Sequence, residues 1–206
     1  MPDLNLNCVI KMKKGTLLLI GLIALFGVYA CSSYNGLVGK DNLVQKAWGE
    51  VQNQYQRRAD LIGNLVKTVQ GAADFEKSTL TDVINARAAA TQIKLDASDL
   101  TPENMAKFEA AQSQLSGSLS RLLVAVEQYP QLKANQNFLE LQAQLEGTEN
   151  RITVARKDFN EATADYNLAV RTFPANLMAG IFGFSQKELF KATDAAQTAP
   201  DVNFKF

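Results

Sequence analysis

Histidine is absent from all 206 residues, and the two cysteines, Cys8 and Cys31, both lie near the N-terminus. Without histidine, the chain lacks the side chain that most easily transfers protons near neutral pH and most often binds transition metals. Residues 40–206 can hold neither a disulfide nor a thiol nucleophile. They also lack the carboxylate spacing of a calcium loop and a glycine-rich phosphate loop. We therefore expect no metal, no cofactor and no small-molecule substrate.

Net charge is lacking as well, because 21 basic and 21 acidic residues cancel. A protein that binds a nucleic-acid backbone needs an excess of positive charge to displace the counterions, so we expect no nucleic-acid partner. Apolar residues, in contrast, are plentiful. Hydrophobic residues make up 47% of the chain, which is enough for the core of one domain and for a membrane anchor.

The longest uncharged run lies between Lys14 and Lys40. Its apolar part, residues 15–36, would form a helix of about 33 Å, long enough to cross a hydrocarbon core about 30 Å thick. Lysines precede the run, and a basic cluster tends to stay in the cytoplasm. We predict a cytoplasmic N-terminus at 1–14, a transmembrane or signal-anchor segment at 15–36, and one extracytoplasmic domain at 37–206.

The same segment has a second interpretation, as a processed signal. MKKGTLLLIG resembles the start of a secretory signal, which makes Met12 a candidate initiator and residues 1–11 a candidate upstream extension. VYAC at 28–31 partly matches a lipoprotein signal, a run of small apolar residues that ends in cysteine, although Tyr29 is bulky. Cys31 is therefore a candidate lipidation site, and the alternative product is a periplasmic lipoprotein anchored through it.

Beyond the anchor, apolar residues recur every three or four positions, which is the period of helices that pack side by side. The first such repeat starts at Val44, and it keeps its phase through Gly71. We therefore expect one helix from about residue 40 to 94. Polar residues that fall on the repeats should fix the register in which the helices pack. They are Arg58, Glu76 and Thr148.

Two further helices are bounded by clear signals. Thr101 is suited to the N-cap and Pro102 to the first position of a second helix, which Pro130 should end. The third helix follows the repeat from Phe138 to Phe173 and should stop at Pro174.

A short last helix is predicted from Ser185, because Glu188 three residues later would complete a capping box. The preceding ANLMAGIFGF, residues 175–184, should be a loop, and residues 198–206 should be extended. The predicted fold is all-α. An N-terminal transmembrane or signal-anchor helix is followed by an elongated antiparallel bundle of three long helices and a short C-terminal helix.

The most enzyme-like stretch is QLEGTENRITVARKDF at 144–159, where Glu146 and Glu149 share one helix face. A hydrolase could use such a carboxylate pair if both groups lay buried in a cleft. The charged residues of this stretch all fall off the apolar repeat, however. We favour exposed or edge ion pairs, each contributing about 0.2–1 kcal/mol, and assign no catalytic residue.

The expected helix lengths do not match. At about 1.5 Å per residue the first helix would be roughly 80 Å long, the second about 40 Å and the third about 55 Å. The third helix should climb away from the membrane, which leaves part of the first without a partner. An exposed apolar stripe of Val44, Trp48, Val51 and Tyr55 would then bind a second copy or another protein. This expectation has one exception, namely that the segment after Pro174 folds back to cover the stripe.

Four stretches of the chain resemble the LemA family. They are YNGLV at 34–38, AWGEVQNQYQRRADLIGNLVKTVQG at 47–71, YPQLKANQNFLELQAQLEGTENRITVARKDFNEATADYN at 129–167, and RTFPANLMAGIFGF at 171–184. The family commonly has proline where this chain has Gly63, and His-Glu where it has Phe75-Glu76. The resemblance implies a membrane-anchored helical bundle of bacterial envelopes with no established enzymatic activity, and a magnetosome-forming relative suggests membrane shaping.

The function expected from these observations is that of a scaffold or adaptor. The chain would be a single-pass protein of the bacterial inner (cytoplasmic) membrane, with most of its residues outside the cytoplasm. Its partners would be membrane lipid and either a protein partner or a second copy of itself. Catalytic activity is not expected.

Overall fold

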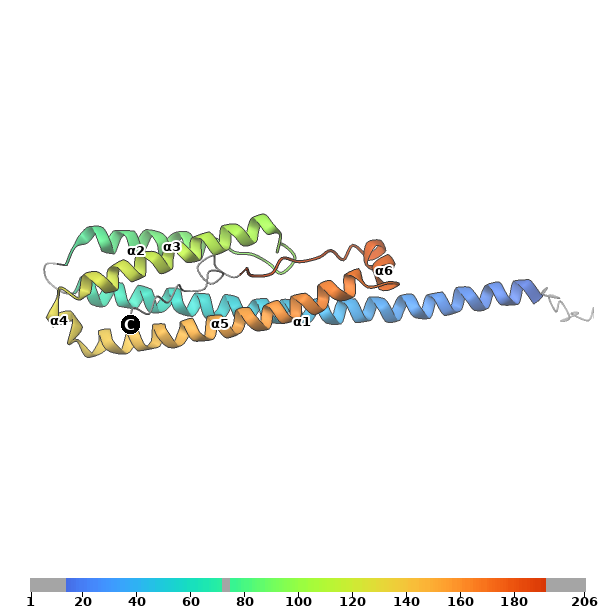
Figure 1. The fold of residues 1–206 in the computed structure, drawn as a ribbon, viewed down its shortest axis with the longest axis horizontal. Helices are drawn as coiled ribbons and strands as arrows, with labels where there is room; N and C mark the ends of the chain where they lie inside the picture. The colour runs from blue at the N-terminus through green and yellow to red at the C-terminus, as the bar shows by residue number, and fades with distance from the viewer. Residues whose placement is uncertain (1–13, 72–74, 192–206) are drawn as a thin grey trace, which may run out of the picture.

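The computed structural model describes residues 14–71 and 75–191, and every regular element in these ranges is a helix. The elements are α1 (Lys14–Gln70), α2 (Lys77–Gln92), α3 (Pro102–Val126), α4 (Pro130–Lys133), α5 (Gln136–Arg171) and α6 (Ala175–Phe182), as Figure 1 shows. The prediction of an all-α fold with an apolar N-terminal helix is confirmed. The predictions for residues 1–13 and 198–206 lie outside the described residues.

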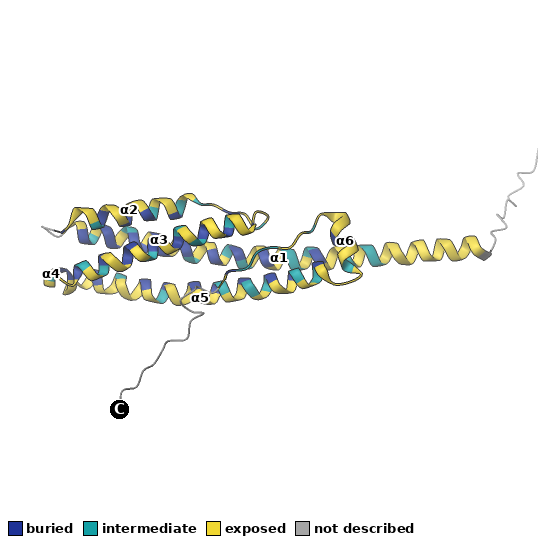
Figure 2. Cartoon of the chain, turned by 45° about the horizontal axis from the view of Figure 1, so that its top comes forward, coloured by how far each residue is buried: buried dark blue, intermediate teal, exposed yellow. Residues whose placement is uncertain are grey.

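Helix α1 has 57 residues and extends about 85 Å without a break. Its first part projects beyond the other helices, and residues 15–28 are all exposed (Figure 2). Among the described helices, α1 alone is long and apolar enough to cross a membrane by length and composition. Its second part, from about Leu37 onward, has a buried face and belongs to the bundle.

The prediction that the first helix continues through Gly71 is wrong. Helix α1 ends at Gln70, and α2 runs back along it. The two helices lie side by side, as the hydrogen bond of 2.6 Å from the Arg87 Nε to the Ala59 carbonyl shows. A repeat that keeps its phase shows only that both segments have an apolar face, and here the two faces pack on each other. Glu76 is the exposed N-cap residue of α2, so its predicted place on a packed seam is also wrong.

The other long helices complete an up-down-up-down bundle. Thr101 Oγ1 accepts a hydrogen bond from the Asn104 amide at the start of α3, as the capping signal predicts. Helix α5 then packs along α1 in the opposite direction (Figure 1), and Trp48 therefore meets Phe159 while Arg58 meets Glu149. The expectation that the third long helix climbs away from the membrane is wrong, since the hairpin at Gly71 reverses every later helix.

The chain after α5 also differs from the prediction. Residues 175–182 are helical, whereas the segment from Ser185, expected to be helical, is extended. Gly183 ends α6 with φ of 77°, a left-handed conformation that glycine adopts without strain. Beyond it, the Glu188 amide donates to the Leu100 carbonyl over 3.1 Å instead of capping a helix. We call residues 184–191 the strap.

Candidate functional site

Two asparagines of α5 hold the strap by its backbone. The Asn167 side chain donates to the Lys187 carbonyl over 2.8 Å and accepts from the Lys187 amide over 2.9 Å. Asn160 makes the same pair of hydrogen bonds with Phe190, over 3.0 and 2.9 Å. Asn160 and Asn167 are seven residues apart and so lie on one face of α5, which matches two residues of the strap three positions apart. Seven helical residues extend about 10 Å, and three residues of the strap reach that distance only if its backbone is extended.

The strap closes an aromatic cluster at the centre of the molecule. The Phe190 ring lies 6.0 Å from that of Trp48 and 5.4 Å from that of Phe159. Trp48 is only 2% exposed, and its indole N–H donates to the Leu95 carbonyl over 2.8 Å. Aromatic rings packed in this way contribute beyond the area they bury, so the cluster joins α1, α5 and the strap.

The apolar stripe expected to bind a partner is therefore not exposed. Its four residues are buried within their own chain, and they are Val44, Trp48, Val51 and Tyr55. As the exception allowed, the segment after Pro174 covers part of the stripe. Helix α5, helix α3 and the loop before α3 cover the rest. Any surface for a second copy or another protein therefore lies elsewhere on the molecule.

A charged residue at the start of the strap adds a second attachment. The Lys187 ammonium lies 2.6 Å from the Asp41 carboxylate of α1 and donates to the Ala97 carbonyl over 2.8 Å. Beside it, the Tyr166 hydroxyl donates to the Ser185 carbonyl over 2.9 Å. Burial, and to a smaller extent the negative charge of Asp41, raises the pKa of Tyr166 to about 12. The phenol is therefore a neutral donor at physiological pH.

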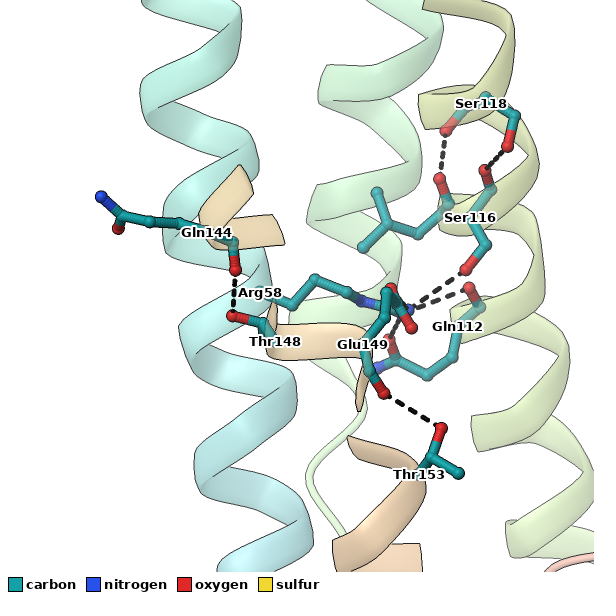
Figure 3. Close-up of polar contacts among 10 residues, drawn as sticks. Arg58, Gln112, Ser116, Ser118, Gln144, Thr148, Glu149 and Thr153 are labelled. Atoms are coloured by element: carbon teal, nitrogen blue, oxygen red, sulfur yellow. Dashed lines mark hydrogen bonds and ion pairs between the residues drawn. The ribbon is translucent and has the colours of Figure 1, made fainter. Parts of the chain in front are cut away.

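An open groove of about 640 Å³ lies between α3 and α5, above the α1 residues Tyr55 and Arg58. Arg58 is 3% exposed, and its guanidinium donates to Glu149 over 2.7 Å, to the Gln112 side chain over 2.6 Å and to Ser116 over 3.1 Å (Figure 3). One buried arginine of α1 thus links α3 and α5, and its Nε finds no partner within the described part of the chain.

The two carboxylates in this groove are each paired with an arginine. A second arginine, Arg156, lies 3.4 Å from Glu109 and 4.4 Å above the ring of Phe190. Burial raises the pKa of Tyr55, although the Arg156 and Arg58 charges oppose the shift. Lys191 also lines the groove and pairs with Glu188 outside it. With three cations, two glutamates and neutral hydroxyls, the groove has the composition of an interhelical polar network.

The two carboxylates considered for a hydrolase are not brought together in this groove. Glu149 lines it and is paired with Arg58, while Glu146 is exposed and does not line it. Thr148 is buried, as its place on the apolar repeat predicts, and its hydroxyl donates to the Gln144 carbonyl of the same helix (Figure 3). This hydrogen bond does not link helices. Cys31 is a free, exposed cysteine in the apolar part of α1. Residues 14–71 and 75–191 contain no group of acids and cysteines arranged to hold a metal ion.

A family model described as the LemA family matches residues 47–204, which is most of the chain. The chain belongs to the LemA family. The matched region of this LemA-family chain begins within α1, beyond the apolar run, and takes in the whole of α5 and the strap.

Curated relatives agree with this assignment. The chain is 26% identical over 182 residues to the magnetosome protein MamQ 2 of Paramagnetospirillum magneticum, covering 80% of this chain and 67% of that protein. It has the same identity and coverage with the magnetosome protein MamQ of Magnetospirillum gryphiswaldense. It is also 23% identical over 169 residues to the protein LemA of Metamycoplasma hominis, covering 82% of this chain and 74% of that protein.

Only some of the residues that organise the site could be predicted from the sequence. Arg58 stood out as a charge on an apolar repeat. Asn160 and Asn167 did not, although their seven-residue spacing beside the apolar face of α5 was a usable signal. Their partners lie 20 to 30 residues away, in a segment with no regular pattern.

Proposed function

We propose that this LemA-family protein is a membrane-anchored scaffold or adaptor of the bacterial envelope, and that it acts by presenting helical surface instead of by turnover. One observation carries the proposal: α1 runs without interruption from the candidate membrane span to the far end of the bundle. Helix α5 packs antiparallel along it and stiffens the connection. A flexible linker would let the domain reorient, whereas a continuous helix fixes its direction and its reach.

The far end of the bundle offers a surface for a protein partner. From Gly36 to Gln70, α1 extends about 50 Å, which sets the distance of this end from the membrane. There a groove between α3 and α5 exposes apolar side chains, with Val124 exposed to 68%. Leu139 faces the same groove, and Glu127 and Lys133 form an ion pair at its rim. Apolar surface rimmed by charge is typical of protein interaction sites.

The names of the relatives support a role at membranes. Two of them are magnetosome proteins, and we extend to this chain a role in membrane organisation or shaping. The basic cluster before the apolar run favours an inner-membrane location with the bundle outside the cytoplasm. In the alternative, a lipid on Cys31 would replace the spanning helix as the anchor.

Photo-crosslinking in living cells tests the adaptor role. A photoreactive amino acid is placed at Val124 or Leu139 of the full chain, and at Lys157 on an exposed polar face of α5 as a control. We expect a discrete protein adduct from the first two positions and none from the control. Equal background labelling at all three positions would contradict the proposed surface.

Topology and anchoring are tested separately. A single cysteine at position 157, in a chain with Cys8 and Cys31 replaced by serine, should react with an impermeant maleimide in spheroplasts without lysis. Labelling only after lysis would place the bundle in the cytoplasm. Mass spectrometry of the wild-type mature chain distinguishes an intact apolar segment from a chain that starts at a lipidated Cys31.

A further inference from the structure

Helix α6 lies beside the end of the apolar run of α1. The Phe182 ring is 4.9 Å from that of Tyr34, and the Phe184 ring is 5.9 Å from it. Leu37 of α1 and Ala179 of α6 are buried in the same core cluster. Figure 1 accordingly places α6 at the end of the bundle nearest the anchor. If residues 15–36 span the membrane, α6 lies at the level where the hydrocarbon ends.

The outer face of α6 is apolar and uncovered. Met178 and Ala179 form its buried side, whereas Leu177 and Ile181, one turn apart, are 54% and 69% exposed. Phe173, just before the helix, is also exposed. No charged residue occurs between Arg171 and Lys187. A helix that faces water normally has polar residues along its outer side, whereas the only polar residue of α6 is Asn176.

We propose that Phe173 and the outer face of α6 form a second membrane contact, in which a short interfacial helix inserts apolar side chains between lipid headgroups beside α1. The occupant is lipid because the exposed apolar side chains of α6 lie level with the end of the apolar run of α1, where Phe182 contacts Tyr34. Figure 2 shows both the projecting part of α1 and the outer side of α6 as exposed. Eight residues extend only about 12 Å, too short to span a bilayer but suited to its surface. Tyrosines such as Tyr34, which contacts Phe182, are enriched at this depth.

The consequence is orientation of the bundle. A single helix through a bilayer can tilt and rotate, while two separate contacts restrict both motions. The strap begins directly after α6, so a membrane-held α6 also keeps the strap in place over Trp48. The inference rests on the membrane anchor of the proposed function.

Depth-dependent quenching tests this contact. The full chain, with both native cysteines replaced by serine, receives one cysteine labelled with an environment-sensitive dye at Leu22, Ile181 or Val124. All three positions are strongly exposed in the isolated chain, so each tolerates the label. The proteins are reconstituted into phosphatidylcholine and phosphatidylglycerol vesicles with or without lipids that have a quencher near the headgroup or deep in the acyl chain.

We expect emission at Ile181 to fall most with the shallow quencher, emission at Leu22 to fall most with a deeper one, and emission at Val124 to stay unchanged. In a chain that also has Leu177→Glu, quenching at Ile181 should be lost while the far-ultraviolet circular dichroism is retained. Quenching at Leu22 with none at Ile181 would overturn the inference and leave the anchor intact. Quenching at neither position would refute the anchor and, with it, the proposed function.

Discussion

The substitution Glu149→Gln tests whether Arg58 organises the bundle. The guanidinium of Arg58 is 3% exposed, and the Glu149 oxygen lies 2.7 Å from it with the carboxylate side chain 48% exposed. Removing one partner of a fully buried pair costs about 3–5 kcal/mol, and an exposed pair contributes about 0.2–1 kcal/mol. Glutamine keeps the shape and one acceptor, and Gln112 and Ser116 still accept from Arg58. We therefore expect a loss of about 1–2 kcal/mol.

The assay is thermal unfolding of the detergent-solubilised full chain, followed by circular dichroism. For a domain of this size the expected loss lowers Tm by roughly 2–8 °C. Glu146→Gln is the matched control, since Glu146 is exposed on the same helix, and it should stay within about 0.5 kcal/mol. In an Arg58→Met background, Glu149→Gln should cost almost nothing. Equal effects of the two glutamine substitutions in the otherwise unaltered chain would refute the role assigned to Arg58.

Three further predictions follow from the packing. Phe159→Ala should cost about 3–5 kcal/mol, measured by thermal unfolding, because the ring is fully buried against Trp48. Asn160→Ala removes two hydrogen bonds to the strap and should speed hydrogen exchange of the Phe190 amide. Stability should fall between about pH 10 and 12, because the Tyr166 pKa is raised in the folded state, so the unfolded chain releases the phenol proton first.

Each of these three predictions has a control and a contrary outcome. An unchanged Tm for Phe159→Ala would mean that the aromatic cluster is not formed. Asn150→Ala, at an exposed position of the same helix, should leave the hydrogen exchange of the strap amides unaltered. Equal exchange in both variants would contradict the role of Asn160 in holding the strap. Tyr166→Phe should flatten the alkaline loss of stability, and an identical pH profile would assign that loss to other groups.

Much of the fold was predictable because its signals are local. Residues 15–36 are uncharged and mostly apolar whatever surrounds them, so the apolar first part of α1, the candidate membrane span, was predictable. The cap at Thr101 and the stop before Pro174 depend on backbone groups within a few residues of each. The apolar repeats also identified buried positions such as Trp48 and Phe159, since a helix must bury its apolar face somewhere.

The direction in which each helix after Gly71 runs, in contrast, was decided only by the tertiary structure. The repeat is in phase on both sides of Gly71, and the same pattern suits one long helix or two helices packed face to face. The two-helix arrangement is the more stable one because it buries the apolar faces of α1 and α2 within one chain. Phe75 packs on Tyr129 near the turn. Once the chain turns there, α5 returns toward the anchor and covers the stripe that was expected to be open.

The strap shows most clearly how contacts between distant residues override a local sequence signal. Ser185 and Glu188 form a valid local helix start, yet the segment is extended because groups far away in sequence satisfy its backbone. Asn160 and Asn167 supply these hydrogen bonds from α5, and the Leu100 carbonyl supplies another. The sequence by itself determined which segments are apolar and where most helices begin and end. Which faces meet, and which capping signal goes unused, depended on contacts between residues far apart, because burial and hydrogen bonding at a distance outweigh a single local cap.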